Sequence, residues 1–134
     1  MSLMQVTYNG GLRTEAHHLD SKNQLITDAP KDNQGQGEAF SPTDLLCTSL
    51  ASCMLTIGAM KARSLGVELQ GVTIQVEKKM QAAPRKVAEI VLRFDWKGLD
   101  QTLPPEHLEQ VKQAAAACPV ALSLDPSIKK TMIW

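Results

Sequence analysis

Two cysteines in unlike settings give this chain its clearest prospect of chemistry. Cys53 lies within a long apolar helical pattern, whereas Cys118 lies just before Pro119, where one helix must stop. They are 65 positions apart, so neither a local metal knuckle nor a short redox loop joins them. If the fold brings them together, the chemistry is that of two thiols passing between dithiol and disulfide.

A cysteine reacts as its thiolate, and only about 3% of an ordinary thiol is ionised at pH 7. A working cysteine therefore needs a cation, a helix N-terminus or hydrogen-bond donors nearby. Cys118 can cap a short helix after Pro119, whose free N–H groups favour negative charge. Cys53 lies about three turns into its own helix and gains nothing from that dipole. Arg13, on an expected strand, is the candidate cation for Cys53.

Each of these residues also has a purely structural interpretation. A free cysteine often acts as a small buried hydrophobe, and Cys53 occupies a core position of its helix. Both interpretations remain open for Cys118. Cys47 lies six residues before Cys53, over half a turn round the helix, and is predicted to be a bystander. Arg13 taken alone is typical of a salt-bridging strand residue.

Composition bounds the class of protein. The 134 residues predict one domain, residues 1–134, with 14 basic and 14 acidic side chains and no run of like charge. This balance argues against nucleic-acid binding and membrane-surface attachment. No export signal and no apolar stretch near the roughly 20 residues of a membrane span are evident, so a cytoplasmic protein with reduced thiols is expected. His17 and His18 are adjacent and His107 stands alone, so neither a metal nor a cofactor is expected.

The order of expected elements indicates an α+β domain. Three strands are predicted at residues 4–8, 12–19 and 25–27, followed by a long polar loop at 28–39. A central helix follows, and then a hairpin with strands at 72–80 and 90–96 and Arg85 at its tip. The chain continues with a second helix, a short helix at 120–124 and a last strand at 128–134. The whole domain thus divides into four parts, residues 1–40, 41–65, 68–97 and 104–134.

The central helix has clear end signals. Ser41 is a capping residue, Pro42 suits the first helical position, and Asp44 completes a near capping box. Gly66 supplies a left-handed stop. One continuous apolar stripe is predicted to be the buried face, made by Leu46, Leu50, Cys53, Ile57 and Met60.

Four segments, in order and with suitable spacing, together resemble the OsmC/Ohr family of thiol-dependent hydroperoxide reductases, in its OsmC-like branch. They run over nearly the whole chain: Gly10-Gly11-Leu12-Arg13-Thr14, Gly37-Glu38-Ala39-Phe40-Ser41-Pro42-Thr43-Asp44-Leu45-Leu46, Ala51-Ser52-Cys53-Met54-Leu55-Thr56, and Cys118-Pro119-Val120.

The resemblance implies an OsmC-like fold, with antiparallel sheets wrapped around long central helices in an intertwined homodimer. It further implies a cofactor-free antioxidant enzyme of the oxidative stress response, acting on organic hydroperoxides. Cys53 would be the peroxidatic thiolate and pass to a sulfenic acid. Cys118 would resolve that acid to a disulfide, which an external dithiol reduces. Arg13 would be the activating cation.

One position departs from the family pattern. The family's peroxidases carry a Pro-Glu pair at the helix start, and that Glu holds the arginine, whereas the aligned residue here is Thr43. A threonine cannot form the ion pair, so Glu38 or Asp44 is expected to orient Arg13. The departure also leaves open a second function, a small-molecule-binding or redox-sensing protein with little turnover.

Overall fold

A computed structural model of the chain describes residues 2–134, and Met1 lies outside the described residues. The elements mix helices and strands, as the predicted α+β class requires. Residues up to 46 form one compact unit and residues 47–134 another. The boundary falls within the long helix α1 (Pro42–Ser64), and each unit is described by itself.

The N-terminal unit contains the three predicted strands. β1 (Met4–Gly10), β2 (Arg13–His18) and β3 (Gln24–Asp28) form one antiparallel sheet in that order. Gly10 and Gly11 make the first turn with φ angles of +83° and +62°, values that glycine adopts without strain.

The loop after β3 is folded back on its own start. It contains a short 3₁₀ helix, η1 (Lys31–Asn33), and Gly37 donates its N–H to the carbonyl of Ala29 over 3.1 Å. Gly35 passes so close to Ala29 that a Cβ atom at Gly35 would lie 1.7 Å from the Ala29 carbonyl oxygen. Only glycine fits this approach, and it brings the end of the loop back beside β3.

The predicted ends of α1 are confirmed. The N–H of Ser41 donates to Asp44 Oδ2 over 2.9 Å, and the N–H of Asp44 donates to Ser41 Oγ over 3.1 Å, which is a reciprocal capping box. At the other end Gly66 has φ +83° and donates to the Arg63 carbonyl over 3.0 Å. Val67 donates to the Ala62 carbonyl over 2.9 Å, completing a Schellman motif.

The predicted buried stripe of α1 is wrong by about one residue. The buried positions are Cys47, Leu50, Ala51, Met54, Gly58 and Ala62. Of the predicted stripe only Leu50 is buried, Cys53 and Ile57 are half-buried at its border, and Met60 is 60% exposed. Small residues set the buried face because they let α2 approach closely: a Cβ at Gly58 would lie 3.6 Å from that of Ala115. A count of large apolar residues overlooks them.

The second unit is built on a three-stranded sheet. β4 (Thr73–Ala82), β5 (Arg85–Asp95) and β6 (Lys129–Ile133) lie in that order. β4 and β5 pair antiparallel, but β5 and β6 pair parallel, so this sheet is mixed and not purely antiparallel as expected. The helices between β5 and β6 form the crossover that a parallel pair needs. Arg85 begins β5 and is not part of the hairpin tip, which is Ala83-Pro84.

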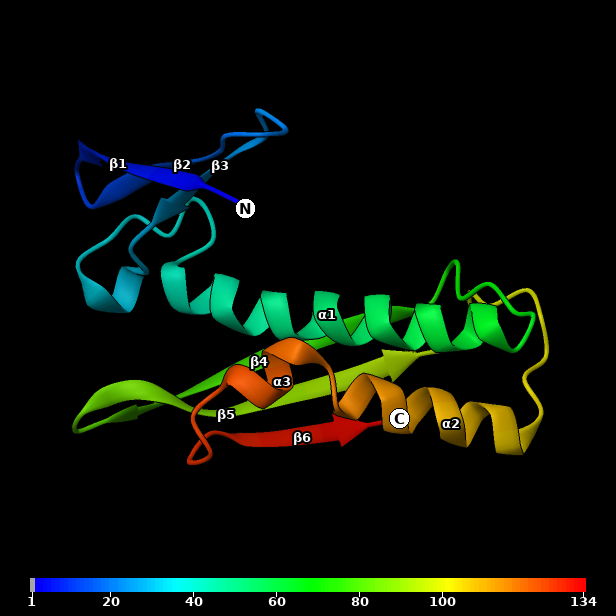
Figure 1. Cartoon of the computed structure of the whole chain (residues 1–134). Helices are drawn as coiled ribbons and strands as arrows, with labels where there is room; N and C mark the ends of the chain where they lie inside the picture. Colours follow the sequence, from blue (N-terminus) through cyan, green and yellow to red (C-terminus); the bar gives the residue numbers. More distant parts are fainter. Residues whose placement is uncertain (1) are drawn as a thin grey trace. The chain divides into compact units, whose positions relative to one another are not determined.

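Helices cover one face of this sheet. Figure 1 shows α1 and α2 (Pro105–Ala116) running along it, with the short α3 (Pro119–Ser123) following α2. The main core joins α1, β5 and the α2–α3 junction, and its buried members are Cys47, Leu50, Ala51, Met54, Val87, Ile90, Leu92, Ala115, Cys118, Ala121 and Ile128.

Among the described residues, α1 is long and apolar enough to cross a membrane by length and composition alone. No apolar stretch of this length was expected from the sequence. Only 33% of its most apolar window is buried within the chain. A core helix of a soluble protein passes the same test, so the observation is weak as a sign of a membrane but shows that much of α1 is not covered by its own chain.

Candidate thiol site

The structure brings Cys53 and Cys118 together. The Cys118 side chain is 0% exposed, and Cys53 is half-buried against the same apolar cluster. Cys53 lies close enough to Cys118 to raise the pKa of its thiol. None of the three cysteines, all within the described residues, forms a disulfide. The two cysteines, 65 positions apart in the chain, come together because α1 and the α2–α3 junction both pack on β5.

The Cys118 thiol is held in its protonated form. Burial is the largest cause and raises its pKa, and the hydrogen bond and charge of Cys53 raise it further. The N–H groups of Ala121 and Val120 act in the opposite direction and lower it. Cys118 is the N-cap residue of α3, as predicted, but without a side-chain capping hydrogen bond. The predicted effect of the helix start is present, since these N–H groups lower the pKa of Cys118, but burial outweighs it.

Cys47 is enclosed in the core. Its side chain is 2% exposed and packs in the same cluster that contains Cys118. A small apolar role fits this position on α1, which is turned away from the half-buried border where Cys53 lies.

Arg13 is held by two carboxylates within the N-terminal unit. Its Nη2 donates to Glu38 Oε2 over 2.5 Å, and its Nε lies 3.6 Å from Asp28 Oδ1. The hydrogen bond and charge of Glu38, followed by the charge of Asp28, raise the pKa of Arg13 above its usual value. Glu38 thus lies where the sequence analysis expected it. Asp28 was missed, although its place directly after the third predicted strand could have indicated a partner for β2.

Asp44 has a local contact at the helix start. Its carboxylate accepts the N–H of Ser41 and closes the capping box of α1. Thr43 has its Oγ1 3.2 Å from Ser41 Oγ at the same helix start. The described contacts of Arg13 are with Glu38 and Asp28, and the role of Asp44 in orienting the arginine stays a prediction. Arg13 and the two thiols belong to different units, and the action of Arg13 on Cys53 stays a prediction.

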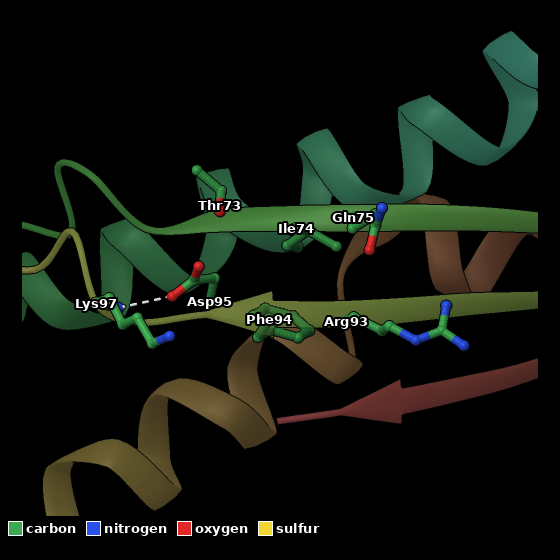
Figure 2. Close-up of a pocket in the computed structure, with 7 residues that line it drawn as sticks. All are labelled: Thr73, Ile74, Gln75, Arg93, Phe94, Asp95 and Lys97. Carbon is green, nitrogen blue, oxygen red and sulfur yellow. Dashed lines mark hydrogen bonds between the residues drawn. The ribbon is translucent and has the colours of Figure 1, made fainter.

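A separate hollow of about 640 Å³ lies over β4 and β5. Figure 2 shows Arg93 and Lys97 on its rim, with Asp95 accepting the N–H of Lys97. Arg93 also donates to Glu77 over 2.9 Å, so its charge is already balanced. None of the five predicted site residues lines this hollow. Among the described residues no three His, Cys, Asp or Glu side chains are grouped to hold a metal ion.

Comparison with known proteins places the chain. The family model described as OsmC-like protein matches residues 35–132. A crystal structure from Psychrobacter arcticus 273-4, provisionally described as an osmotic stress induced and detoxification response protein, is 50% identical with a TM-score of 0.92, over 99% of this chain and 95% of that one. No curated protein sequence matches.

More distant structures share the fold. The organic hydroperoxide resistance protein OsmC of Legionella pneumophila is 18% identical with a TM-score of 0.76, over 99% of this chain and 95% of that one. The organic hydroperoxide resistance protein OhrB of Bacillus subtilis is 15% identical with a TM-score of 0.65, over 99% and 96%. The family model covers well over half of the residues, and the chain belongs to the family of OsmC-like proteins.

Proposed function

We propose that this chain is a thiol-dependent peroxidase that reduces organic hydroperoxides in the cytoplasm. The observation that carries the proposal is the pairing of a half-buried Cys53 with a fully buried Cys118 in one apolar cluster. Membership of a family that includes organic hydroperoxide resistance proteins supports it. Cys53 is the exposed member, so it is the thiol that a peroxide can reach.

The first step oxidises Cys53. Its thiolate sulfur attacks the outer oxygen of the hydroperoxide, forming an S–O bond as the O–O bond breaks. The alkoxide leaves, takes up a proton and becomes the alcohol. Cys53 becomes a sulfenic acid, having given two electrons to the peroxide.

The second step forms the disulfide. The Cys118 sulfur attacks the sulfenic sulfur of Cys53, an S–S bond forms, and the S–O bond breaks. Cys118 brings a proton to this step because its raised pKa keeps it a thiol. That proton leaves with the hydroxyl group as water. An external dithiol then reduces the disulfide by two thiol–disulfide exchanges and is itself oxidised.

Arg13 is the proposed cation for the Cys53 thiolate. The family's peroxidases hold this arginine with a Glu where this chain has Thr43. Here Glu38, from the loop before α1, supplies a carboxylate instead. Its Oε2 accepts a hydrogen bond from Arg13 Nη2 over 2.5 Å. The ion pair that Thr43 cannot make is therefore supplied from another position, which favours an active peroxidase.

The active form is proposed to be a homodimer. The outward side of α1 carries Met60 at 60% exposure together with Ser52 and Thr56, and β1 exposes Met4 and Tyr8. Apolar surface of this kind is stabilised when it is covered and removed from water. Serine and threonine among the apolar residues suit contact with another protein chain better than contact with lipid, so a second copy is the proposed cover.

The experiment is hydroperoxide consumption with a supplied dithiol. Cumene hydroperoxide and dihydrolipoamide are given to the wild type and to Cys53→Ser, Cys118→Ser and Cys47→Ala. We expect Cys53→Ser to abolish turnover and Cys47→Ala, the matched control, to retain it. Turnover by Cys53→Ser equal to that of the wild type would refute the proposal.

A second function is favoured by Thr43 alone. If the arginine is held too weakly for fast chemistry, the chain is a small-molecule-binding or redox-sensing protein. Its signature would be a rise in the melting temperature with hydroperoxide or its alcohol product, without consumption of peroxide. Rapid consumption in the assay above excludes it.

A further inference from the structure

Asp28 is a buried carboxylate at the end of β3. Its side chain is 1% exposed, and its Oδ2 accepts the N–H of Glu38 over 2.9 Å. Its Oδ1 accepts no hydrogen bond from any described residue. The nearest cation is Arg13, whose Nε lies 3.6 Å away. A buried charge without a partner is costly, so the Asp28 carboxylate is stabilised by keeping the Arg13 guanidinium beside it.

The backbone around Asp28 fixes the carboxylate in place. Asp28 and Arg13 are opposite each other in the β2–β3 ladder. The N–H of Asp28 donates to the carbonyl of Phe40 over 3.0 Å, and the N–H of Ala29 donates to the carbonyl of Leu12 over 3.2 Å. Asp28 therefore joins three things: the strand that carries Arg13, the end of the loop, and the backbone of Glu38.

The two acids hold Arg13 in different ways. Glu38 makes the shorter contact, but its side chain is 63% exposed. Water screens an exposed ion pair and competes for it, so such pairs contribute little. Asp28 makes the longer contact from a site that water does not reach. By distance Glu38 would be the stronger partner of Arg13, and by burial Asp28 would be. Burial has the larger effect, because water can replace the arginine at the exposed Glu38 carboxylate but not at the buried Asp28 carboxylate.

We infer that Asp28 is the positioning residue that fixes the Arg13 guanidinium, and that Glu38 is its exchangeable outer partner. Asp28 orients the Nε edge of the Arg13 guanidinium. Glu38 binds the terminal nitrogen Nη2, and its side chain can leave this contact for solvent. The consequence for Cys53 rests on the proposed function, in which Arg13 favours its thiolate. Asp28 acts there only through Arg13.

The first test needs no thiol. Solvent exchange of the Arg13 Nε–H is measured by ¹⁵N NMR in the wild type and compared with that of Arg63. Arg63 is a matched control because its Nε donates to Glu68 over 3.0 Å with both side chains more than half exposed. We expect slower exchange at Arg13. Equal exchange rates would overturn the inference, whatever the activity of the protein.

The second test compares two isosteric charge removals. Asp28→Asn removes the negative charge but keeps an oxygen that can accept the N–H of residue 38. Glu38→Gln removes the charge of the outer acid but keeps an oxygen that can accept a hydrogen bond from Arg13. Arg13 Nε–H exchange should quicken in Asp28→Asn and stay near the wild-type rate in Glu38→Gln. The reverse order would show that Glu38 holds the arginine.

The third test asks whether Arg13 and its two acids, Asp28 and Glu38, affect Cys53. The rate of Cys53 alkylation by iodoacetamide at pH 7, read by peptide mass, should fall about ten-fold in Asp28→Asn. In an Arg13→Ala background the same substitution should cause no further change. A further fall there would mean that Asp28 acts through the loop and not through Arg13. If Arg13→Ala alone leaves alkylation unchanged, the proposed activation fails while the exchange tests still decide where Arg13 is held.

Discussion

Cys118 lies fully buried at the start of α3, and Cys53 of α1 is half-buried against the same apolar cluster. Cys53 raises the pKa of Cys118, after the larger effect of burial. In the proposed peroxidase the more exposed Cys53 would meet the peroxide first, with Cys118 behind it as a thiol.

The oxidation state of Cys53 should depend on Cys118. In Cys118→Ser, one equivalent of hydroperoxide should leave Cys53 as a sulfenic acid, or as a sulfinic acid with excess peroxide, because no thiol is left to resolve it. Trapping with a dimedone reagent and peptide mapping would detect the adduct. Labelling of Cys118 in the wild type in place of Cys53 would reverse the two roles.

Cys47 should stay reduced throughout. Its 2% exposure means that thiol reagents reach it only after unfolding. Oxidised wild type should therefore release one slow thiol on addition of denaturant, and the disulfide should map to Cys53 and Cys118. A bridge that contains Cys47 would contradict this assignment.

Alkaline solutions should destabilise the chain through Cys118. Its pKa is raised in the folded state, mainly by burial, so the folded state binds the proton more tightly than the unfolded one. This stability is fully present below the unfolded value of about 8.5 and is lost as pH rises through the folded value. Melting temperatures from neutral to alkaline pH should fall less steeply in Cys118→Ala than in the wild type. Parallel slopes in the two proteins would rule out this linkage.

Two glycines of the α1 region should respond in opposite ways to alanine. Gly58 has an ordinary helical backbone and room for a Cβ, so Gly58→Ala should stabilise by about 0.5–1 kcal/mol. Gly66 has φ +83°, so Gly66→Ala should destabilise by about 1–2 kcal/mol. Denaturant unfolding of the two variants measures both. A loss of stability in Gly58→Ala would mean that α1 and α2 pack more tightly than described.

The proposed dimer depends on the outward side of α1. Sedimentation of the wild type at micromolar concentration should give twice the chain mass of 14.6 kDa. Met60→Glu places a charge on the exposed apolar side and should shift the protein toward a monomer, whereas Lys61→Glu, one position round the helix, serves as a control. A wild type that sediments as a monomer would remove the case for a second copy.

Local signals in the sequence predicted the ends of α1 well. The capping box of Ser41 and Asp44 and the Gly66 stop are decided within a few residues, so no tertiary contact is needed to find them. The same local signals did not separate the acids near Arg13. Asp44 is a predicted partner of Arg13, and its described contact is with Ser41 at its own helix start.

Features that depend on distant partners were harder to predict. The buried face of α1 is set by the approach of α2 to Gly58, which no periodicity of large residues reveals. Asp28 became visible only when the β2–β3 register placed it opposite Arg13. The thiol pair was predicted only as a condition on the fold, because its members are 65 positions apart in the chain.

The parallel pairing of β5 with β6 has a consequence for how the protein folds. Strands β1 to β3 follow one another through short turns, so their contacts close quickly. The β5–β6 ladder instead joins segments separated by α2 and α3, and such long loops close slowly. The pairing of Arg13 with Asp28 in the β2–β3 ladder should therefore form early, and the core around Cys118 should form late. If β6 docks last, Cys118 would be open to oxidation until then, and a reducing environment would protect the chain while it folds.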